Sequence, residues 1–244
     1  MCGRYVMRRD DDEISTLYGA QVIGDPPGPS WNVAPRQQVR VVLERAAGKD
    51  SDHDQVDEGD GQPQRQLRTA QWGLVPSWSK DQKIGAKLIN ARSETITEKP
   101  AFRRAAAHRR CLVPADGYYE WEAVDDGKQP YFLHSGNQVL AMAGLYELWP
   151  DPTKDADDPT RWLWTMTVLT TTATDAAGEI HDRSPVVLPS DLINDWLNPE
   201  LTDTGKVRDL LAAVPSPTLQ PDPVSRNVNS VRNNGPALLQ PVHT

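Results

Sequence analysis

The feature that most restricts the possible folds is a series of short, closely spaced apolar segments between residues 111 and 170. The run Val139–Leu145 is apolar on both faces, which is typical of a central strand. No alternation of strands with long helices accompanies these segments, so the sequence predicts an α+β fold with a mainly antiparallel, barrel-like β-sheet. The strands predicted in this region are Cys111–Pro114, Tyr118–Ala123, Pro130–His134, Val139–Glu147 and Trp162–Thr170.

The flanking segments add further strands and peripheral helices. Residues 2–8 read as a first strand, and residues 38–44 as a strand that pairs with residues 65–73. Apolar spacing and capping residues predict the helices. The first predicted helix follows the capping residues Asp10–Asp12, and the second runs from Ser93 or Thr97 to about His108. The last two are Asp191–Leu197 and Lys206–Val214.

The length of 244 residues suits one domain, which we place at residues 1–244. Two acidic tracts, 48–63 and 151–160, read as disordered insertions in that domain. No apolar run is long enough to span a membrane, and the N-terminus lacks the apolar core of a secretory signal. Two widely separated cysteines suit a reducing compartment, so we expect a cytoplasmic protein.

The net charge of −8 argues against a nucleic-acid partner, but the charges are unevenly distributed. Residues 50–60 hold six acidic residues and no Lys or Arg, and residues 151–158 hold four acidic residues against one Lys. Outside these two segments the balance is +1, and from Lys83 to Arg110 eight Lys or Arg face two Glu. The sequence therefore allows a basic surface that binds phosphate, although a solvated helix face explains the same residues equally well.

The second residue, Cys2, carries chemistry that no internal residue has. Removal of Met1 leaves an α-amine and a thiol on adjacent carbons, and the amine is partly unprotonated near neutral pH. With an aldehyde the amine forms an imine, and the thiol then closes a thiazolidine ring. From these residues alone, an ordinary cysteine at the start of a strand is the commoner interpretation.

Three polar residues in apolar or turn segments are further candidates. Glu120 lies among aromatic residues, where partial desolvation favours acid–base work, although an alternating strand would more often point it outward. His181 stands before Pro185 on a predicted loop and could shuttle protons or simply satisfy a turn. Asn90 could donate a hydrogen bond in a site or cap a helix. No spacing of His and Cys predicts a metal site, and no cofactor is expected.

Aromatic and cationic residues provide possible contacts to nucleic acid. Trp31, Trp72 and Trp78, with Pro35, could present faces to unstacked bases, although each is more often a core residue. Arginines beside the candidate catalytic residues could bind phosphate. These arginines are Arg4, Arg92 and Arg183.

Taken together, several motifs resemble the SOS-response-associated peptidase (SRAP) family. They occur in the family's order over residues 1 to about 198, and a late segment at 228–236 also fits. The motifs are MCGRY at 1–5, WNVAPRQ at 31–37, WGLVPSW at 72–78, NARSET at 90–95, RRCLVPADGYYEW at 109–121 and IHDRSPVVL at 180–188. Ser184 in the last motif replaces an expected Met, a change that concerns local packing.

The resemblance implies a sensor of abasic sites in single-stranded DNA, which shields the lesion in a covalent thiazolidine crosslink to Cys2. It implies catalytic roles for Cys2, Asn90, Glu120 and His181. It also implies DNA-binding roles for Arg4, Pro35, Trp72, Arg92 and Arg183, the arginines on phosphates and the other two residues beside splayed bases. With this function we expect a monomer that associates with the nucleoid when engaged on DNA.

Two other functions remain open at this stage. The family's name suggests a cysteine peptidase in which Cys2 attacks an amide with help from His181 and Asn90. A nucleic-acid-binding module without chemistry is the other alternative. Weak lyase activity is also expected, because an imine at an abasic sugar can lead to strand cleavage by β-elimination.

Overall fold

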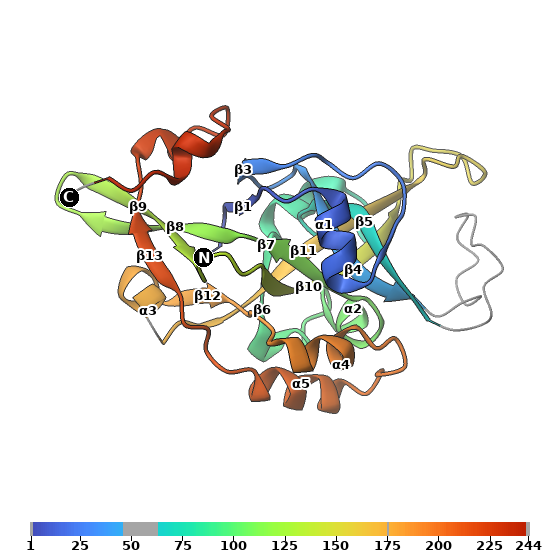
Figure 1. The fold of residues 1–244 in the computed structure, drawn as a ribbon. Helices are drawn as coiled ribbons and strands as arrows, with labels where there is room; N and C mark the ends of the chain where they lie inside the picture. The colour runs from blue at the N-terminus through green and yellow to red at the C-terminus, as the bar shows by residue number, and fades with distance from the viewer. Residues whose placement is uncertain (1, 46–62, 175, 243–244) are drawn as a thin grey trace.

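The computed structural model describes residues 2–45, 63–174 and 176–242 (Figure 1). Within these residues a mixed β-barrel closes where β11 pairs in parallel with β5, and all its other strand pairs are antiparallel. The barrel strands are β4 (Gln38–Arg45), β5 (Gln64–Trp72), β7 (Arg110–Ala115), β10 (Leu140–Pro150) and β11 (Trp162–Thr172). This arrangement confirms the predicted α+β fold with a barrel-like sheet.

Two predictions about the barrel depend on simple sequence patterns. The β4–β5 pair joins Gln38 to Gln71 and Arg45 to Gln64, so the predicted partners do pair. The apolar run predicted as a central strand forms β10, which is buried along almost its whole length between β7 and β11. Short strands extend the barrel sheet. They are β2 (Gln21–Val22), β6 (Asn90–Arg92) and β12 (Arg183–Pro185).

A second sheet lies beside the barrel, on the left of Figure 1, and carries the N-terminal strand. Its order is β13-β9-β8-β1-β3, with antiparallel pairing throughout. The strands are β1 (Tyr5–Met7), β3 (Ser30–Val33), β8 (Gly117–Val124), β9 (Gly127–His134) and β13 (Gln220–Pro223). A small second core packs this sheet against the C-terminal segment through Val6, Tyr119, Phe132, Val224, Val228 and Leu238.

The helices lie at the periphery (Figure 1). They are α1 (Asp11–Tyr18), α2 (Arg103–His108), α3 (Ala176–Ile180), α4 (Ile193–Leu197) and α5 (Thr204–Ala213). Helix α1 follows a capping box between Asp10 and Glu13 and buries Ile14 and Tyr18. Short 3-10 helices complete the description. These are η1 (Gln82–Lys87), η2 (Ser93–Thr95), η3 (Ser190–Leu192), η4 (Arg226–Asn229) and η5 (Pro236–Leu239).

Some local predictions differ from the structure. The single helix expected up to His108 is divided into η2, a run of turns and α2, because Pro100 disfavours helical backbone at the residue before it. Residues 151–160, expected to be disordered, form turns held by hydrogen bonds such as Lys154 Nζ to the Thr160 carbonyl, at 2.6 Å. The other expected insertion, 48–63, lies almost entirely outside the described residues. No helix in the described ranges is long and apolar enough to cross a membrane.

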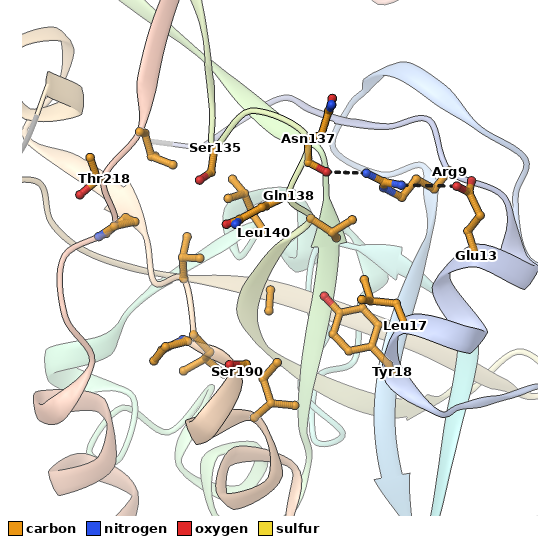
Figure 2. Close-up of a pocket in the computed structure, with 18 of the residues that line it drawn as sticks. Arg9, Glu13, Leu17, Tyr18, Ser135, Asn137, Gln138, Leu140, Ser190 and Thr218 are labelled. Carbon is orange, nitrogen blue, oxygen red and sulfur yellow. Dashed lines mark hydrogen bonds and ion pairs between the residues drawn. The ribbon is translucent and has the colours of Figure 1, made fainter.

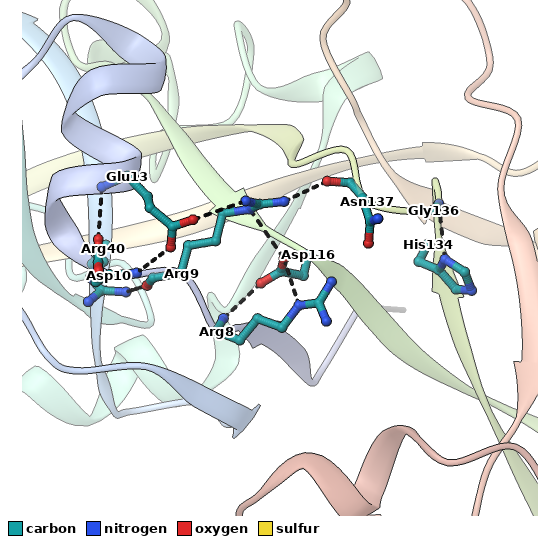
Figure 3. A network of polar contacts seen from close by, with 9 residues as sticks. All are labelled: Arg8, Arg9, Asp10, Glu13, Arg40, Asp116, His134, Gly136 and Asn137. Carbon is teal, nitrogen blue, oxygen red and sulfur yellow. Dashed lines mark hydrogen bonds and ion pairs between the residues drawn. The ribbon is translucent and has the colours of Figure 1, made fainter.

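Strand β1 is fixed at its C-terminal end by Asp116, which is only 3% exposed (Figure 3). The Asp116 carboxylate accepts hydrogen bonds from the Arg8 backbone N–H at 2.7 Å and from Arg8 Nε at 3.1 Å. The Asp116 N–H in turn donates to the Val6 carbonyl at 2.8 Å. These contacts hold the strand that leads from Cys2 against β8.

Candidate functional site

Cys2 is fully buried, and two residues separate it from the start of β1 at Tyr5. Its backbone carbonyl accepts a hydrogen bond from Asn90 Nδ2 at 2.7 Å. Burial raises the pKa of the Cys2 thiol, and the nearby negative charge of Glu120 raises it further. The thiol is therefore protonated at neutral pH, which distinguishes it from a cysteine activated as a thiolate.

Asn90 reaches Cys2 from β6, which runs parallel to β11 with Asn90 opposite Val168. Because side chains alternate along a strand, Asn90 and Arg92 project to one face while the buried Ala91 between them faces the core. Asn90 Oδ1 is buried and accepts no hydrogen bond from the residues that the structure describes. Its amide thus combines a committed donor with an acceptor that a substrate hydroxyl or amine can use.

Glu120 comes from β8, the strand next to β1. Tyr5 lies opposite Tyr118, and the Tyr119 N–H donates to the Arg4 carbonyl at 2.9 Å, so Glu120 lies beside the start of the chain. The Glu120 side chain is buried, with 5% exposure. The alternative of an outward-facing strand residue is therefore wrong, because both faces of β8 are covered at this position.

His181 lies on the loop between α3 and β12, and α3 packs against β8. Its Nδ1 is 3.1 Å from the Arg183 N–H and 2.8 Å from Asp182 Oδ1. In the neutral ring Nδ1 accepts from Arg183 and Nε2 carries the proton, whereas the protonated ring pairs with Asp182. The partly exposed His181 ring is thus oriented by its two neighbours, Asp182 and Arg183.

The three predicted phosphate-binding arginines have different surroundings. Arg4 is half-buried above the Trp121 ring and donates to the Asn32 side chain and to the carbonyls of Val228 and Asn229. Desolvation lowers the pKa of Arg4. This guanidinium holds the C-terminal segment against β1, so its hydrogen bonds in the structure stabilise the fold.

Arg183 is nearly buried, whereas Arg92 is exposed. Arg183 forms a bidentate ion pair with Glu94, with N–O distances of 2.6 and 2.9 Å. Arg92 is exposed, and its side chain makes no hydrogen bond or ion pair with another described residue. Of the three arginines, Arg92 is the one whose charge is directly available to a phosphate.

Trp72 has a core role instead of the predicted contact with bases. It is fully buried, its indole N–H donates to the Ile89 carbonyl at 2.8 Å, and its ring lies 5.3 Å from that of Tyr5. A base needs an exposed ring face, and Trp72 presents none. Trp78 in the same sequence motif is 60% exposed and offers such a face.

Pro35 lies half-buried in the turn after β3. The next residue, Arg36, is exposed and has φ of 72°, the one positive φ of a residue other than glycine in the described chain. The turn is fixed to the end of β5, because Arg36 N donates to the Trp72 carbonyl and Trp72 N to the Gln37 carbonyl. Strained backbone of this kind clusters at functional sites, and Arg36 belongs to the motif WNVAPRQ, although no role was predicted for it.

A cavity of about 1140 Å³ lies elsewhere, between α1, the β9–β10 turn and residues 187–190 (Figure 2). Its walls are largely apolar and include Leu17, Tyr18 and Leu140, with the Arg9–Glu13 pair at its edge. None of the predicted catalytic residues lines it. No group of His, Cys, Asp or Glu in the described ranges could hold a metal ion.

Comparisons with known proteins cover almost the whole chain. The family model "SOS response associated peptidase (SRAP)" matches residues 1–231. The chain is 36% identical over 245 residues to the abasic site processing protein YoqW of Bacillus subtilis, covering 98% of this chain and 99% of that protein. It is 30% identical over 251 residues to the abasic site processing protein YedK of Escherichia coli, covering 99% and 100%. A solved protein structure from Bacteroides thetaiotaomicron has the same fold, with a TM-score of 0.75 at 22% identity over 99% of this chain and 100% of that one.

Proposed function

Because the chain belongs to the SOS response associated peptidase (SRAP) family, we propose that it recognises abasic sites in DNA and captures them in a covalent crosslink. Its relatives in Bacillus subtilis and Escherichia coli are named abasic site processing proteins. The observation that carries the proposal for this chain is the placement of Cys2, held by Asn90 and lying in the electrostatic field of Glu120.

The proposed reaction requires that Met1 is removed, so that Cys2 carries a free amine. The amine adds to the C1′ aldehyde of the opened abasic sugar, and loss of one water gives an imine. The Cys2 sulfur then adds to the imine carbon while its proton passes to the nitrogen, which closes a thiazolidine. The Cys2 thiol supplies both the sulfur and the proton of this last step.

The surrounding residues have distinct proposed roles. Glu120 transfers protons between the amine, the sugar oxygen and the thiol, since its buried carboxyl lies beside the start of the chain. Asn90 holds the Cys2 carbonyl and accepts a hydrogen bond from the sugar through Oδ1. His181 assists ring opening of the sugar, because its ring nitrogens can hold or release a proton next to Asp182.

We further propose that the substrate strand is single-stranded at the lesion. The amine has to reach C1′, and a single strand can bend at the lesion toward a buried residue without disrupting the base pairs that would flank the lesion in a duplex. Arg92 supplies a free cationic side chain for the backbone, and Trp78 supplies an exposed ring on which a neighbouring base can stack.

Crosslinking to synthetic oligonucleotides tests this function. The processed protein, with its N-terminus established by intact mass, is incubated with abasic single strands, abasic duplexes and undamaged strands, and each mixture is run on a denaturing gel. We expect a denaturation-resistant band with the abasic single strand and none with the undamaged strand, and Cys2→Ala abolishes it. The absence of that band from a preparation with a confirmed N-terminal Cys2 would refute the proposal.

A cysteine peptidase is the alternative function for this site. A peptidase would use the Cys2 thiol alone, whereas the proposed crosslink also needs the free amine. An N-terminal extension that leaves Cys2 inside the chain separates the two activities, because it keeps the thiol and converts the amine into an amide. The proposed crosslink then disappears, while a peptidase would remain active. Strand cleavage by β-elimination from the imine is the expected side reaction.

A further inference from the structure

We propose that Glu94 occupies, in the DNA-free protein, the place of a DNA phosphate on Arg183, so that a bound strand has to exchange its phosphate for this carboxylate. Glu94 would thereby lower the affinity for any single strand, damaged or not. This inference deepens the proposed function and rests on its single-stranded DNA substrate.

The first support is the geometry of the ion pair. Arg183 Nη1 donates to Glu94 Oε1 at 2.6 Å, and Arg183 Nη2 donates to Glu94 Oε2 at 2.9 Å. Two parallel bonds from one guanidinium are also how arginine binds a phosphate, since carboxylate and phosphate present similarly spaced oxygens. The carboxylate therefore uses the same donors that a DNA phosphate would need.

The second support is that Arg183 is held in place independently of Glu94. Its Nη2 also donates to the Thr170 carbonyl at 2.6 Å, and its Nη1 lies 3.4 Å from the Thr172 hydroxyl. The Arg183 side chain is 10% exposed, whereas that of Glu94 is 47% exposed. The arginine is thus a fixed, nearly buried receptor, and the carboxylate is an exposed group that can move away into solvent.

The third support is the charge around Glu94. Hydrogen bonds from Arg183 lower the pKa of Glu94 most, and the charges of Arg183 and Arg92 lower it further. The carboxylate thus lies in the combined field of two arginines, one of which is exposed and makes no side-chain hydrogen bond or ion pair with another described residue. An anion in this position neutralises charge that would otherwise attract the DNA backbone.

The pair also connects two segments of the proposed site. Asn90, which contacts Cys2, begins the short strand β6. Glu94 lies in η2, which directly follows that strand. Arg183 donates its backbone N–H to His181 Nδ1 at 3.1 Å. Arg183 therefore joins the His181 loop to the segment that holds Cys2, and a phosphate next to the captured sugar could reach it.

The consequence concerns selectivity. If each strand has to displace Glu94, backbone contacts alone give weak binding to undamaged DNA, and retention depends on the covalent step at Cys2. Substitution of Glu94 should then strengthen binding to DNA that carries no lesion.

The test compares Glu94→Gln with Asp126→Asn, because Asp126 also pairs with an arginine on the surface, Arg226, at 2.7 Å. Both substitutions raise the net charge equally. Binding of an undamaged single-stranded oligonucleotide is measured by fluorescence anisotropy over a series of salt concentrations. We expect Glu94→Gln to bind several-fold more tightly than wild type, with an unchanged slope of log K against log salt, because the same number of phosphates is bound in both proteins once Glu94 is displaced. Asp126→Asn should match wild type, and in an Arg183→Ala background Glu94→Gln should add no more than Asp126→Asn does.

Three outcomes would overturn the inference. Weaker binding by Glu94→Gln would mean that the carboxylate positions Arg183 for DNA. Unchanged binding, or equal gains in Glu94→Gln and Asp126→Asn, would mean that the ion pair has no specific role. The proposed function is judged separately by the abasic crosslink: wild-type crosslinking with unchanged Glu94→Gln binding refutes only this inference, whereas tighter Glu94→Gln binding without any crosslink refutes the covalent function.

Discussion

Replacing Asn90 with alanine tests whether the hydrogen bond to the Cys2 carbonyl organises the reacting residue. The bond from Asn90 Nδ2 is 2.7 Å long and part-buried, and its loss leaves the Cys2 carbonyl without this donor. An unsatisfied buried polar group costs roughly 1–3 kcal/mol. If that cost falls on the transition state for amine addition, the crosslinking rate decreases about 5- to 160-fold, since each 1.36 kcal/mol is a factor of ten.

The assay is single-turnover crosslinking to an abasic oligonucleotide at saturating protein, followed on denaturing gels. Gln129→Ala is a matched control, because Gln129 Nε2 also donates part-buried hydrogen bonds to backbone carbonyls, those of Pro130 and Val224, at 2.8 and 2.9 Å. We expect Gln129→Ala to lower the free energy of unfolding by a comparable amount and to leave the crosslinking rate unchanged.

The reasoning would be refuted by an Asn90→Ala protein that loses stability like Gln129→Ala but crosslinks within about twofold of the wild-type rate, a difference of roughly 0.4 kcal/mol. Such a result would mean that Asn90 only joins β6 to the N-terminal segment. A large loss of rate with unchanged stability would instead place its main role in the reaction, through the Oδ1 acceptor.

The other predictions concern pH, aromatic contacts and charge. Burial raises the pKa of the thiols of Cys2 and Cys111. Their contribution to stability is therefore present below about pH 8.5, the ordinary cysteine pKa, and is lost as the pH rises above it. A melting temperature that stays constant from about pH 8 to 10 would contradict this prediction. Trp78→Ala should weaken single-stranded DNA binding by about 1–3 kcal/mol without changing the melting temperature, which anisotropy and thermal melts measure together. Trp72→Ala should instead lower the free energy of unfolding by about 3–5 kcal/mol in urea titrations, and a stable variant with a pure binding defect would restore the predicted base contact. Arg92→Ala should reduce the salt slope of binding by about 0.7, and an unchanged slope would show that Arg92 contacts no phosphate.

Local sequence patterns predicted the elements whose apolar or capping residues lie within one short segment. The β4–β5 pair and the buried strand β10 follow from runs of apolar and β-branched residues. Helix α1 follows from an acidic cap and an apolar face, both contained in residues 10–18. Where Pro100 interrupts a helical pattern, the predicted helix fails for an equally local reason.

The sequence by itself also predicted the residue that the proposed chemistry requires, because an amine and a thiol on one residue require a cysteine at the start of the processed chain. Only the tertiary structure decided the surroundings of that residue and of its predicted partners. Burial and partner choice depend on contacts between segments far apart in sequence, and one strand pattern is compatible with either face. Thus Glu120 is buried beside Cys2 although its strand could have turned it outward, and Trp72 lies in the core while Trp78 is exposed. For the same reason the Arg183 guanidinium, expected to be free for phosphate, is held by a carboxylate that no local pattern pairs with it.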